Sequence, residues 1–290
     1  MVAATAAAWV ETGGQVQTDF IDYAVDDAIA TITLTRTAAA NAVSLEMLDD
    51  LDEAFQMATV DPEVRVIILQ ADGKHFCAGH DITSVGNDEQ PTKWTLSNII
   101  EIEAKRYLEY SLRWRNVPKP TLAAVQGVCI AGGLMLAWPC DLIIAADNAR
   151  FSDPVVAMGI GGVEYHGHTW EWGPRKAKEL LFTGRAMTAQ EAFEGGMVTK
   201  VVALDDLRSE TRALAETIAK QHPFALRQAK RAVNQTLDVQ GFYAAIQSVF
   251  DIHQTGHGNA ISETGLPIMM LLDGMKEQVN KPALKNADER

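Results

Sequence analysis

The sequence predicts an α/β fold in which strands alternate with helices, followed by a helical C-terminal part. Between Ala28 and Leu34, apolar residues occupy every second position, a spacing typical of a strand. From Ser44 to Ala58, apolar residues recur every three or four positions behind a serine N-cap, which predicts an amphipathic helix. The β-branched run from Val64 to Gln70 then predicts a strand that is buried on both faces.

Shorter elements continue this alternation through the middle of the chain. Helical spacing extends from Thr95 to Trp114, where two prolines follow and end it. The segment TLAAVQG, residues 121–127, predicts another buried strand. Two glycines precede a short apolar helix over Leu134 to Trp138, and a strand is expected over Asp141 to Ala146.

The last third of the chain is predicted to be mostly helical. Thr188 and Glu191 have the spacing of a capping box ahead of a short helix. A last strand is expected over Val198 to Val202. Two long helices, separated by a proline, are expected over Leu204 to Lys220 and Phe224 to Leu237.

Composition and charge exclude several classes of protein. The formal net charge is -13, so general partnership with nucleic acid or anionic lipid is not expected. No apolar run reaches the roughly 18 to 20 residues of a membrane span, and the first fifteen residues lack the basic start of a signal peptide. The three cysteines are odd in number and lack metal-ligand spacing, which favours free thiols in a reducing cytoplasm.

Ordered motifs in the first two thirds of the chain bear on function. They are HFCAGHDI (75–82), KPTLAAVQGVCIAGGLMLAWPCDLIIA (119–145), ARFSDPVVAMGI (149–160) and LLFTGRAMTAQEAFEGGMVTKVV (180–202). In order, spacing and content they resemble the crotonase superfamily, the enoyl-CoA hydratase/isomerase family, over roughly residues 19–234. A single AGG or FTG would be weak support, but the ordered set is specific.

The resemblance implies a crotonase-like spiral of ββα units with a C-terminal helical trimerisation region. It implies an acyl-CoA substrate, no cofactor other than coenzyme A as part of that substrate, and a homotrimer or a dimer of trimers. We therefore expect a flexible N-terminal extension (residues 1–17), a spiral core (18–215) and a C-terminal helical region (216–290).

The resemblance also implies an oxyanion hole. When the carbon next to a thioester carbonyl loses a proton, the carbonyl oxygen becomes negative and needs preorganised donors. In the family one backbone amide follows the AG motif and the other lies in the GG motif, which here indicates His80 and Gly132. Each such donor contributes roughly 3 kcal/mol of transition-state stabilisation. Taken singly, these glycines are equally typical of turns and close packing.

The sequence departs from the hydratase pattern at two positions. Enoyl-CoA hydratases of the family carry a glutamate after the GG motif and another after a Phe-x-x-Pro-like segment, where this chain has Met135 and Val155. Neither side chain transfers protons. Hydration by the usual two-glutamate route is therefore not expected.

Candidate acid–base residues lie in and before the loop GGVEYHGHTWEWG. Related isomerases and dehalogenases carry an aspartate about a dozen residues beyond the motif phenylalanine, which points to Glu164 as the first candidate. His166 and Asp153 are the next candidates, since histidine titrates near neutrality and Asp153 follows Phe151 closely. Each also has a structural explanation: Glu164 in a loop facing water, His166 at the surface or in a hydrogen bond, and Asp153 capping a turn.

The remaining expectations concern the pocket and competing functions. Met135, Val155, Tyr165 and Trp170 are expected to line an acyl pocket, the aromatic pair suggesting a bulky or cyclic acyl group. Glu164-x-His166-x-His168 has an alternating spacing that offers three metal ligands, but the resembling family works without metal, so none is expected. Two competing functions are a hydrolase of a cyclic β-diketone or acyl-CoA that uses Glu164 and His166, and an acyl-CoA-binding homologue without activity.

Overall fold

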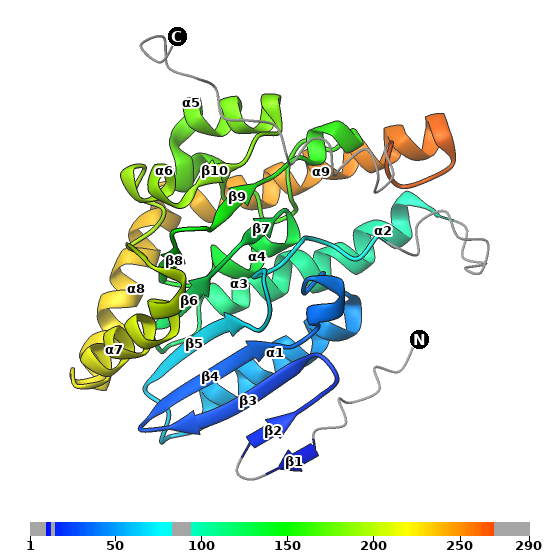
Figure 1. Ribbon diagram of the computed structural model, residues 1–290. Coiled ribbons are helices and arrows are strands. Elements are labelled where there is room, and N and C mark those ends of the chain that lie inside the picture. The colour runs from blue at the N-terminus through cyan, green and yellow to red at the C-terminus, as the bar shows by residue number, and fades with distance from the viewer. Residues whose placement is uncertain (1–9, 13–14, 83–93, 270–290) are drawn as a thin grey trace.

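The structure is a computed structural model that describes residues 10–12, 15–82 and 94–269 (Figure 1). Within these ranges an eight-stranded sheet has the order β1-β2-β3-β4-β5-β6-β8-β11, and a three-stranded sheet has the order β10-β9-β7. From β4 to β11 the neighbours in the large sheet are parallel, whereas β1 to β4 pair antiparallel. The strands are β1 (Val10–Thr12), β2 (Gln15–Gln17), β3 (Ile21–Asp26), β4 (Ile29–Leu34), β5 (Val66–Ala71), β6 (Thr121–Val125), β7 (Val128–Ile130), β8 (Leu142–Ala146), β9 (Arg150–Ser152), β10 (Met187–Thr188) and β11 (Lys200–Val202).

Helices connect the parallel strands and form most of the C-terminal part (Figure 1). The α-helices are α1 (Leu45–Val60), α2 (Leu96–Glu103), α3 (Tyr110–Arg115), α4 (Gly132–Ala137), α5 (His168–Thr183), α6 (Ala189–Glu194), α7 (Leu207–Ala219), α8 (Pro223–Val239) and α9 (Phe242–Thr264). Short 3-10 helices are η1 (Thr37–Ala39), η3 (Val155–Met158) and η4 (Leu204–Asp206), and η2 (Ala104–Glu109) is a π-helix. No helix in the described ranges is both long enough and apolar enough to cross a membrane.

The large sheet is covered on both faces, which explains its continuous apolar strands. In β5, Ile67 and Leu69 belong to the core cluster that includes α1, whereas Val66 and Ile68 pack with α7 on the opposite face. A strand buried on both faces needs apolar side chains at successive positions rather than alternate ones. The mixed α/β core with C-terminal helices therefore agrees with the fold class predicted from the sequence.

Local capping signals lie where the sequence indicated. The Ser44 hydroxyl accepts a hydrogen bond of 3.2 Å from the Met47 amide and caps α1. Thr188 and Glu191 form the predicted capping box at the start of α6. The segment predicted as one helix from residue 95 is instead α2, η2 and α3 in succession.

The first seventeen residues differ from the expectation of a free extension. Strand β2 pairs with β3, and β1 pairs with β2, so part of this segment extends the large sheet. The Ala-rich start, which suggested an extension, lies outside the described residues.

Candidate active site

The loop that carries the AG motif is held by backbone contacts on both sides. Asn41 is fully buried, and its side-chain amide donates to the carbonyls of Asp72 (3.0 Å) and His75 (2.9 Å). Further along, the Cys77 amide donates to the Val128 carbonyl, which joins the loop to β7. Gly79 has φ +103, and a Cβ there would lie 3.2 Å from the Ile130 carbonyl oxygen. Glycine is therefore required at the point where this loop passes β7.

The two residues whose amides are expected to form the oxyanion hole, His80 and Gly132, are in contact. A Cβ on Gly132 would lie 3.2 Å from the backbone nitrogen of His80, so the start of α4 is in contact with the AG loop. Neither amide donates to a backbone carbonyl within the described ranges. Before Gly132, Ala131 has φ 43 and ψ -104, a strained conformation of the kind found at functional sites. Free amides at a helix start and a strained residue beside them match a preorganised anion site.

A cavity of about 310 Å³ opens beside His80. Its lining is largely apolar, with a smaller set of polar and titratable side chains. The apolar lining, as far as the chain is described, comprises Leu45, Ile82, Trp94, Ile99, Ile102, Val155, Met158, Ile160, Val163, Pro267 and Ile268. The polar and titratable lining comprises His80, Asp81, Asn98, Glu103, Tyr107, Glu164, His253 and His257. An apolar pocket with a few convergent polar groups is the usual form of a small-molecule site.

Glu164 faces this cavity rather than water. Only 3% of the residue is exposed, and its Oε2 lies 3.3 Å from His80 Nε2. Its Oε1 lies 3.6 Å from His253 Nε2. Burial alone lowers the pKa of His80, but the Glu164 carboxylate outweighs it and raises that pKa above its usual value. The structure thus brings Glu164 to the side chain of His80, whose backbone amide lies beside Gly132.

Asp153 supports the loop that carries Glu164. Its Oδ2 accepts one hydrogen bond of 2.7 Å from the Val163 amide and lies 2.7 Å from Nε2 of the fully buried His168. Burial raises the pKa of Asp153, but the hydrogen bond and charge of His168 together hold it below its usual value. Asp153 is not among the residues that line the cavity in the described part of the chain. Asp153 was the second candidate acid, but in the structure it is a buried residue that anchors Val163, which precedes Glu164.

His166 does not accompany Glu164 into the cavity. Its ring packs against that of His168 with centroids 4.1 Å apart, and burial lowers the pKa of His166 to about 4. The expected Glu164–His166 pair is therefore replaced by Glu164 with His80 and His253. The spacing of Glu164, His166 and His168 as three metal ligands fails for the same reason, because His168 Nε2 is taken by Asp153.

Three of the four residues expected in the acyl pocket lie elsewhere. Met135 is fully buried inside α4, within the main core. Tyr165 and Trp170 both pack against Phe242, at ring distances of 6.2 and 5.3 Å, behind the loop. Glu164 enters the cavity, whereas the next residue, Tyr165, is held away from it by packing against Phe242. Val155 alone of the four lines the cavity as expected.

The sequence interpretation missed a second group of titratable residues on the cavity. It consists of Glu103 at the end of α2 with His253 and His257 on α9. Burial alone raises the pKa of Glu103, but hydrogen bonds from the two imidazoles hold it far below its usual range. Burial lowers the pKa of His253, whereas Glu164 and Glu103 together raise it to about 9. The spacing His253-x-x-x-His257, one helical turn, was the signal that the sequence offered.

The π-helix η2 begins directly after Glu103 and carries Tyr107 to the cavity. The rings of Tyr107 and His80 are 4.7 Å apart. Burial and the nearby carboxylates of Glu164 and Glu103 raise the pKa of Tyr107 well above its usual value, so its hydroxyl stays protonated. Single π-helical turns inside α-helices are frequent at functional sites.

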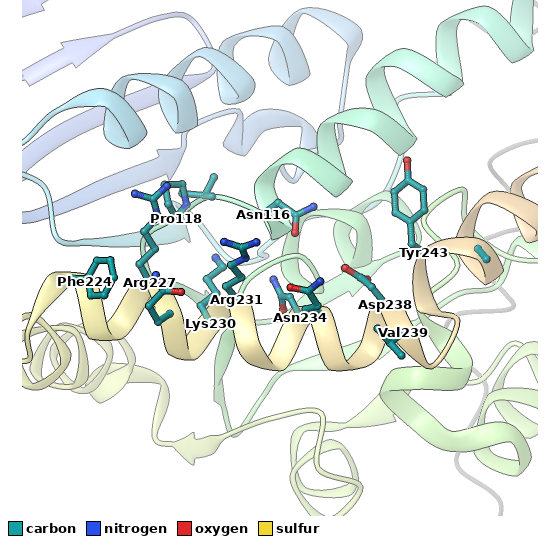
Figure 2. Close-up of a pocket in the computed structure, with 14 residues that line it drawn as sticks. Asn116, Pro118, Phe224, Arg227, Lys230, Arg231, Asn234, Asp238, Val239 and Tyr243 are labelled. Atoms are coloured by element: carbon teal, nitrogen blue, oxygen red, sulfur yellow. The ribbon is translucent and has the colours of Figure 1, made fainter.

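A larger groove, of about 970 Å³, lies away from this chemistry between α8 and the turn after α3 (Figure 2). Arg227, Lys230 and Arg231 of α8 line it, together with the half-exposed Tyr243 (Figure 2). Among the described residues, the groove and the cavity share no lining side chain. Size alone would make the groove the first choice for a site, but the smaller cavity holds the buried acid–base groups.

A family profile, a curated relative and two crystal structures all point to the same family. The profile of the family described as enoyl-CoA hydratase/isomerase matches residues 24–265. The putative enoyl-CoA hydratase EchA13 of Mycobacterium tuberculosis is 43% identical over 265 residues, which are 85% of this chain and 83% of that protein. A crystal structure of a probable enoyl-CoA hydratase from Mycobacterium smegmatis has a TM-score of 0.83 and 68% identity, covering 87% of this chain and all of that one. A second, from Mycobacterium thermoresistibile, has a TM-score of 0.83 and 69% identity, covering 86% and 99%.

Proposed function

The chain belongs to the enoyl-CoA hydratase/isomerase family, and within it we propose an enzyme that moves a proton on an acyl-CoA thioester, with Glu164 as the acid–base group. One observation carries the proposal. The Glu164 carboxylate is buried in an apolar cavity 3.3 Å from the side chain of His80, whose backbone amide lies beside Gly132. A base and an oxyanion hole in one dry pocket are what enolate chemistry needs.

The proposed reaction begins with the thioester oxygen at the His80 and Gly132 amides. Glu164 takes a proton from a carbon of the acyl chain, and the electron pair of the broken C–H bond moves into the thioester as an enolate. The two amides donate to the resulting oxyanion. Glu164 then returns the proton to a different carbon, so that the double bond shifts and no atom is gained or lost. Isomerisation is the reaction that a single carboxylate performs alone.

Hydration is the second candidate, favoured by the other carboxylate on the cavity. The usual glutamate positions hold Met135, which is buried in the core, and Val155, which is apolar. Glu103, bonded to His253 and His257, supplies a second titratable group in the same pocket as Glu164. In this scheme Glu164 and the Glu103 group divide the work of activating water and protonating carbon.

A hydrolase and a binding protein without activity have less support from the geometry. A hydrolase that pairs Glu164 with His166 needs both side chains on one cavity, and His166 packs against His168 instead. A binding protein without activity would leave the oxyanion amides without a neighbouring acid, whereas Glu164 lies in the same pocket.

Turnover of an acyl-thioester panel by wild type and Glu164→Gln tests the proposal. The panel contains crotonyl-CoA, a 3-enoyl-CoA and a cyclic β-ketoacyl-CoA. We expect the 3-enoyl-CoA to be isomerised by the wild type and kcat to fall by about 10²–10⁴ in the variant. Glu171→Gln is the matched control, because Glu171 is also a shielded carboxylate but does not line the cavity.

Each outcome separates the candidates. Hydration of crotonyl-CoA that depends on Glu164 and also on Glu103 favours the second scheme. Release of CoA from the cyclic substrate favours the hydrolase. Binding of all three esters without turnover would show that the protein lacks the activity.

The assembly and the location are part of the proposal as well. Helix α8 has a strongly two-sided sequence, yet none of its residues is buried in the single chain. Phe224, Val233 and Val239 of this helix are more than half exposed, which fits a subunit interface. We assign α8 to the contacts of a homotrimer or a dimer of trimers, measurable by light scattering. The three free cysteines fit a reducing cytoplasm.

A further inference from the structure

Helices α2 and α9 pack together (Figure 1). Glu103, His253 and His257 form a compact group between them, with their ligand atoms within 4.8 Å of one another. All three residues are less than 8% exposed. The two histidines are one turn apart on α9, so both rings project from the same face toward the end of α2. Burying two imidazoles and a carboxylate is costly unless they are paired with one another or bind an ion.

The outer nitrogen of each imidazole is held by a backbone carbonyl. His253 Nδ1 lies 2.7 Å from the Gly162 carbonyl oxygen, and His257 Nδ1 lies 2.6 Å from the Pro267 carbonyl oxygen. A carbonyl only accepts hydrogen bonds, so each Nδ1 carries a proton. The Nε2 of each ring is therefore the ligand atom, and a metal ion takes the place of the proton with which that nitrogen donates to Glu103. Histidines bound to metal ions are oriented in the same way, by a hydrogen bond from the ring nitrogen that faces away from the ion.

The two Nε2 atoms converge on one point. His253 Nε2 and His257 Nε2 are 3.0 Å apart, and each lies 3.2 Å from one oxygen of the Glu103 carboxylate. At this distance a positive charge must lie among the three side chains, either as protons on the rings or as a metal ion that replaces them. Tetrahedral zinc with bonds of about 2.0–2.1 Å to imidazole nitrogen separates its ligand atoms by about 3.3 Å. The three side chains thus have the spacing of metal ligands before any ion is added.

The site also has an outer support and an open side. The Gln254 side chain donates a 2.6 Å hydrogen bond to Glu103 Oε2, which fixes the carboxylate. All three ligands line the cavity that holds Glu164, whose Oε1 is 3.6 Å from His253 Nε2. Two histidines and one carboxylate with an open position are the ligand set of catalytic zinc and of non-haem iron.

We propose that Glu103, His253 and His257 bind one divalent transition-metal ion of the iron-to-zinc group, with its open position facing the acyl cavity. Imidazole ligands favour these ions over magnesium and calcium, which prefer oxygen. The ion offsets the charge of the two buried carboxylates, Glu103 and Glu164. It gives the cavity a Lewis acid or a bound water beside the oxyanion amides.

Metal titration of the full chain, without substrate, tests the inference independently of the proposed activity. The protein is stripped with a chelator and titrated by calorimetry with Zn²⁺, with Fe²⁺ under anaerobic conditions and with Mg²⁺. We expect one equivalent of Zn²⁺ or Fe²⁺ per chain and no competition from Mg²⁺. Bound Zn²⁺ should also raise the midpoint of thermal unfolding, because it binds the folded state alone. Co²⁺ substitution should give the visible absorption of a nitrogen- and oxygen-bound ion.

Two variants locate the site and one controls for the surface. His257→Gln keeps a side chain that donates to the Pro267 carbonyl, and Glu103→Gln keeps the shape of the carboxylate. Each should weaken binding by about 100-fold or more, since a lost ligand costs at least as much as a lost hydrogen-bond partner of a ligand. His222→Ala removes an exposed histidine and should leave binding unchanged. Circular dichroism of each variant confirms that it folds.

Two results would overturn the inference. If no metal binds with a stoichiometry of one, a proton shared between the imidazoles holds the group together instead. If Zn²⁺ binds equally well to His257→Gln and Glu103→Gln, the ion occupies a different place. Turnover of the acyl-thioester panel is unaffected by either result, so failure of the metal site and failure of the proposed function are distinguishable.

Discussion

Two buried groups of carboxylates and histidines lie on either side of the loop between β9 and α5. One contains Glu164 with His80 and faces the cavity. The other contains Asp153 with His168 and lies inside the wall. The residue types are the same, and a sequence motif does not separate them. The difference is access to the cavity, which depends on the packing. A group that faces the cavity can react with a ligand, and a group inside the wall can only support the fold.

The two groups also differ in the lengths of their polar contacts. Asp153 Oδ2 has two donors within 2.7 Å, the Val163 amide and the His168 ring. Glu164 Oε2 and His80 Nε2 are buried and form an ion pair at 3.3 Å, a longer contact than either of those at Asp153 Oδ2. Asp153 Oδ1 and His168 Nδ1 have no hydrogen-bond partner among the described residues, so the contrast rests on Asp153 Oδ2, whose two short hydrogen bonds hold the loop in place. A group with unsatisfied capacity in a pocket is available to a ligand.

The largest stability effect is expected for Asp153→Asn. The amide cannot serve two donors at the Oδ2 position with the strength of a charged carboxylate. We expect the free energy of unfolding to fall by about 2–3 kcal/mol, measured by urea denaturation with an unchanged m-value. Glu164→Gln, the matched change on the cavity, should shift stability by less than about 1 kcal/mol.

The opposite pattern would break the distinction between the two groups. If Asp153→Asn leaves stability intact and lowers kcat by the same factor as Glu164→Gln, then Asp153 takes part in the chemistry.

A pair of histidine substitutions sharpens the comparison with a smaller effect. His80→Gln removes the ring beside Glu164 but keeps the backbone amide, so kcat should fall by about 10-fold rather than to zero. His166→Gln, in the wall, should change kcat by less than about 2-fold. Steady-state kinetics on the 3-enoyl-CoA gives both values. Equal losses in the two variants would mean that the effect of His80 is structural.

The sequence predicted most of the fold because its signals are local. The Ser44 cap and the Thr188–Glu191 box act within one turn, and the apolar run of β5 reports burial on both faces. Such features depend on neighbours a few residues away. Glu164 was also predicted from the sequence, because it lies about a dozen residues beyond Phe151, where related enzymes carry an acid.

The rest of the site could not be predicted because its residues are distant in the chain. His253 lies 150 residues from Glu103, and no spacing rule links them. Three polar residues on the buried side of α9, His253, Gln254 and His257, also interrupt the apolar pattern that would have marked a helix. Tyr165 and Trp170 were placed in the pocket by their chemistry, but the direction of a side chain in an irregular loop depends on packing, here against Phe242.

Glu171 offers a test outside the cavity, because it is a shielded carboxylate with no histidine partner among the described residues. Burial raises the pKa of Glu171 to about 7, although the charge of Arg115 opposes this. The folded protein therefore holds a proton that the unfolded chain releases above its ordinary pKa of 4.5. This contribution to stability is complete below that value and is lost as the pH rises through about 7.

Glu171→Gln should remove this pH dependence. The difference in unfolding free energy between variant and wild type should move in favour of the variant by about 2–3 kcal/mol between pH 5 and pH 8. Denaturation curves at intervals across that range measure it, and contributions from all other groups cancel in the difference. A difference that stays constant with pH would mean that Glu171 is ionised in the folded protein. Burial alone would then be insufficient to hold a proton on this carboxylate.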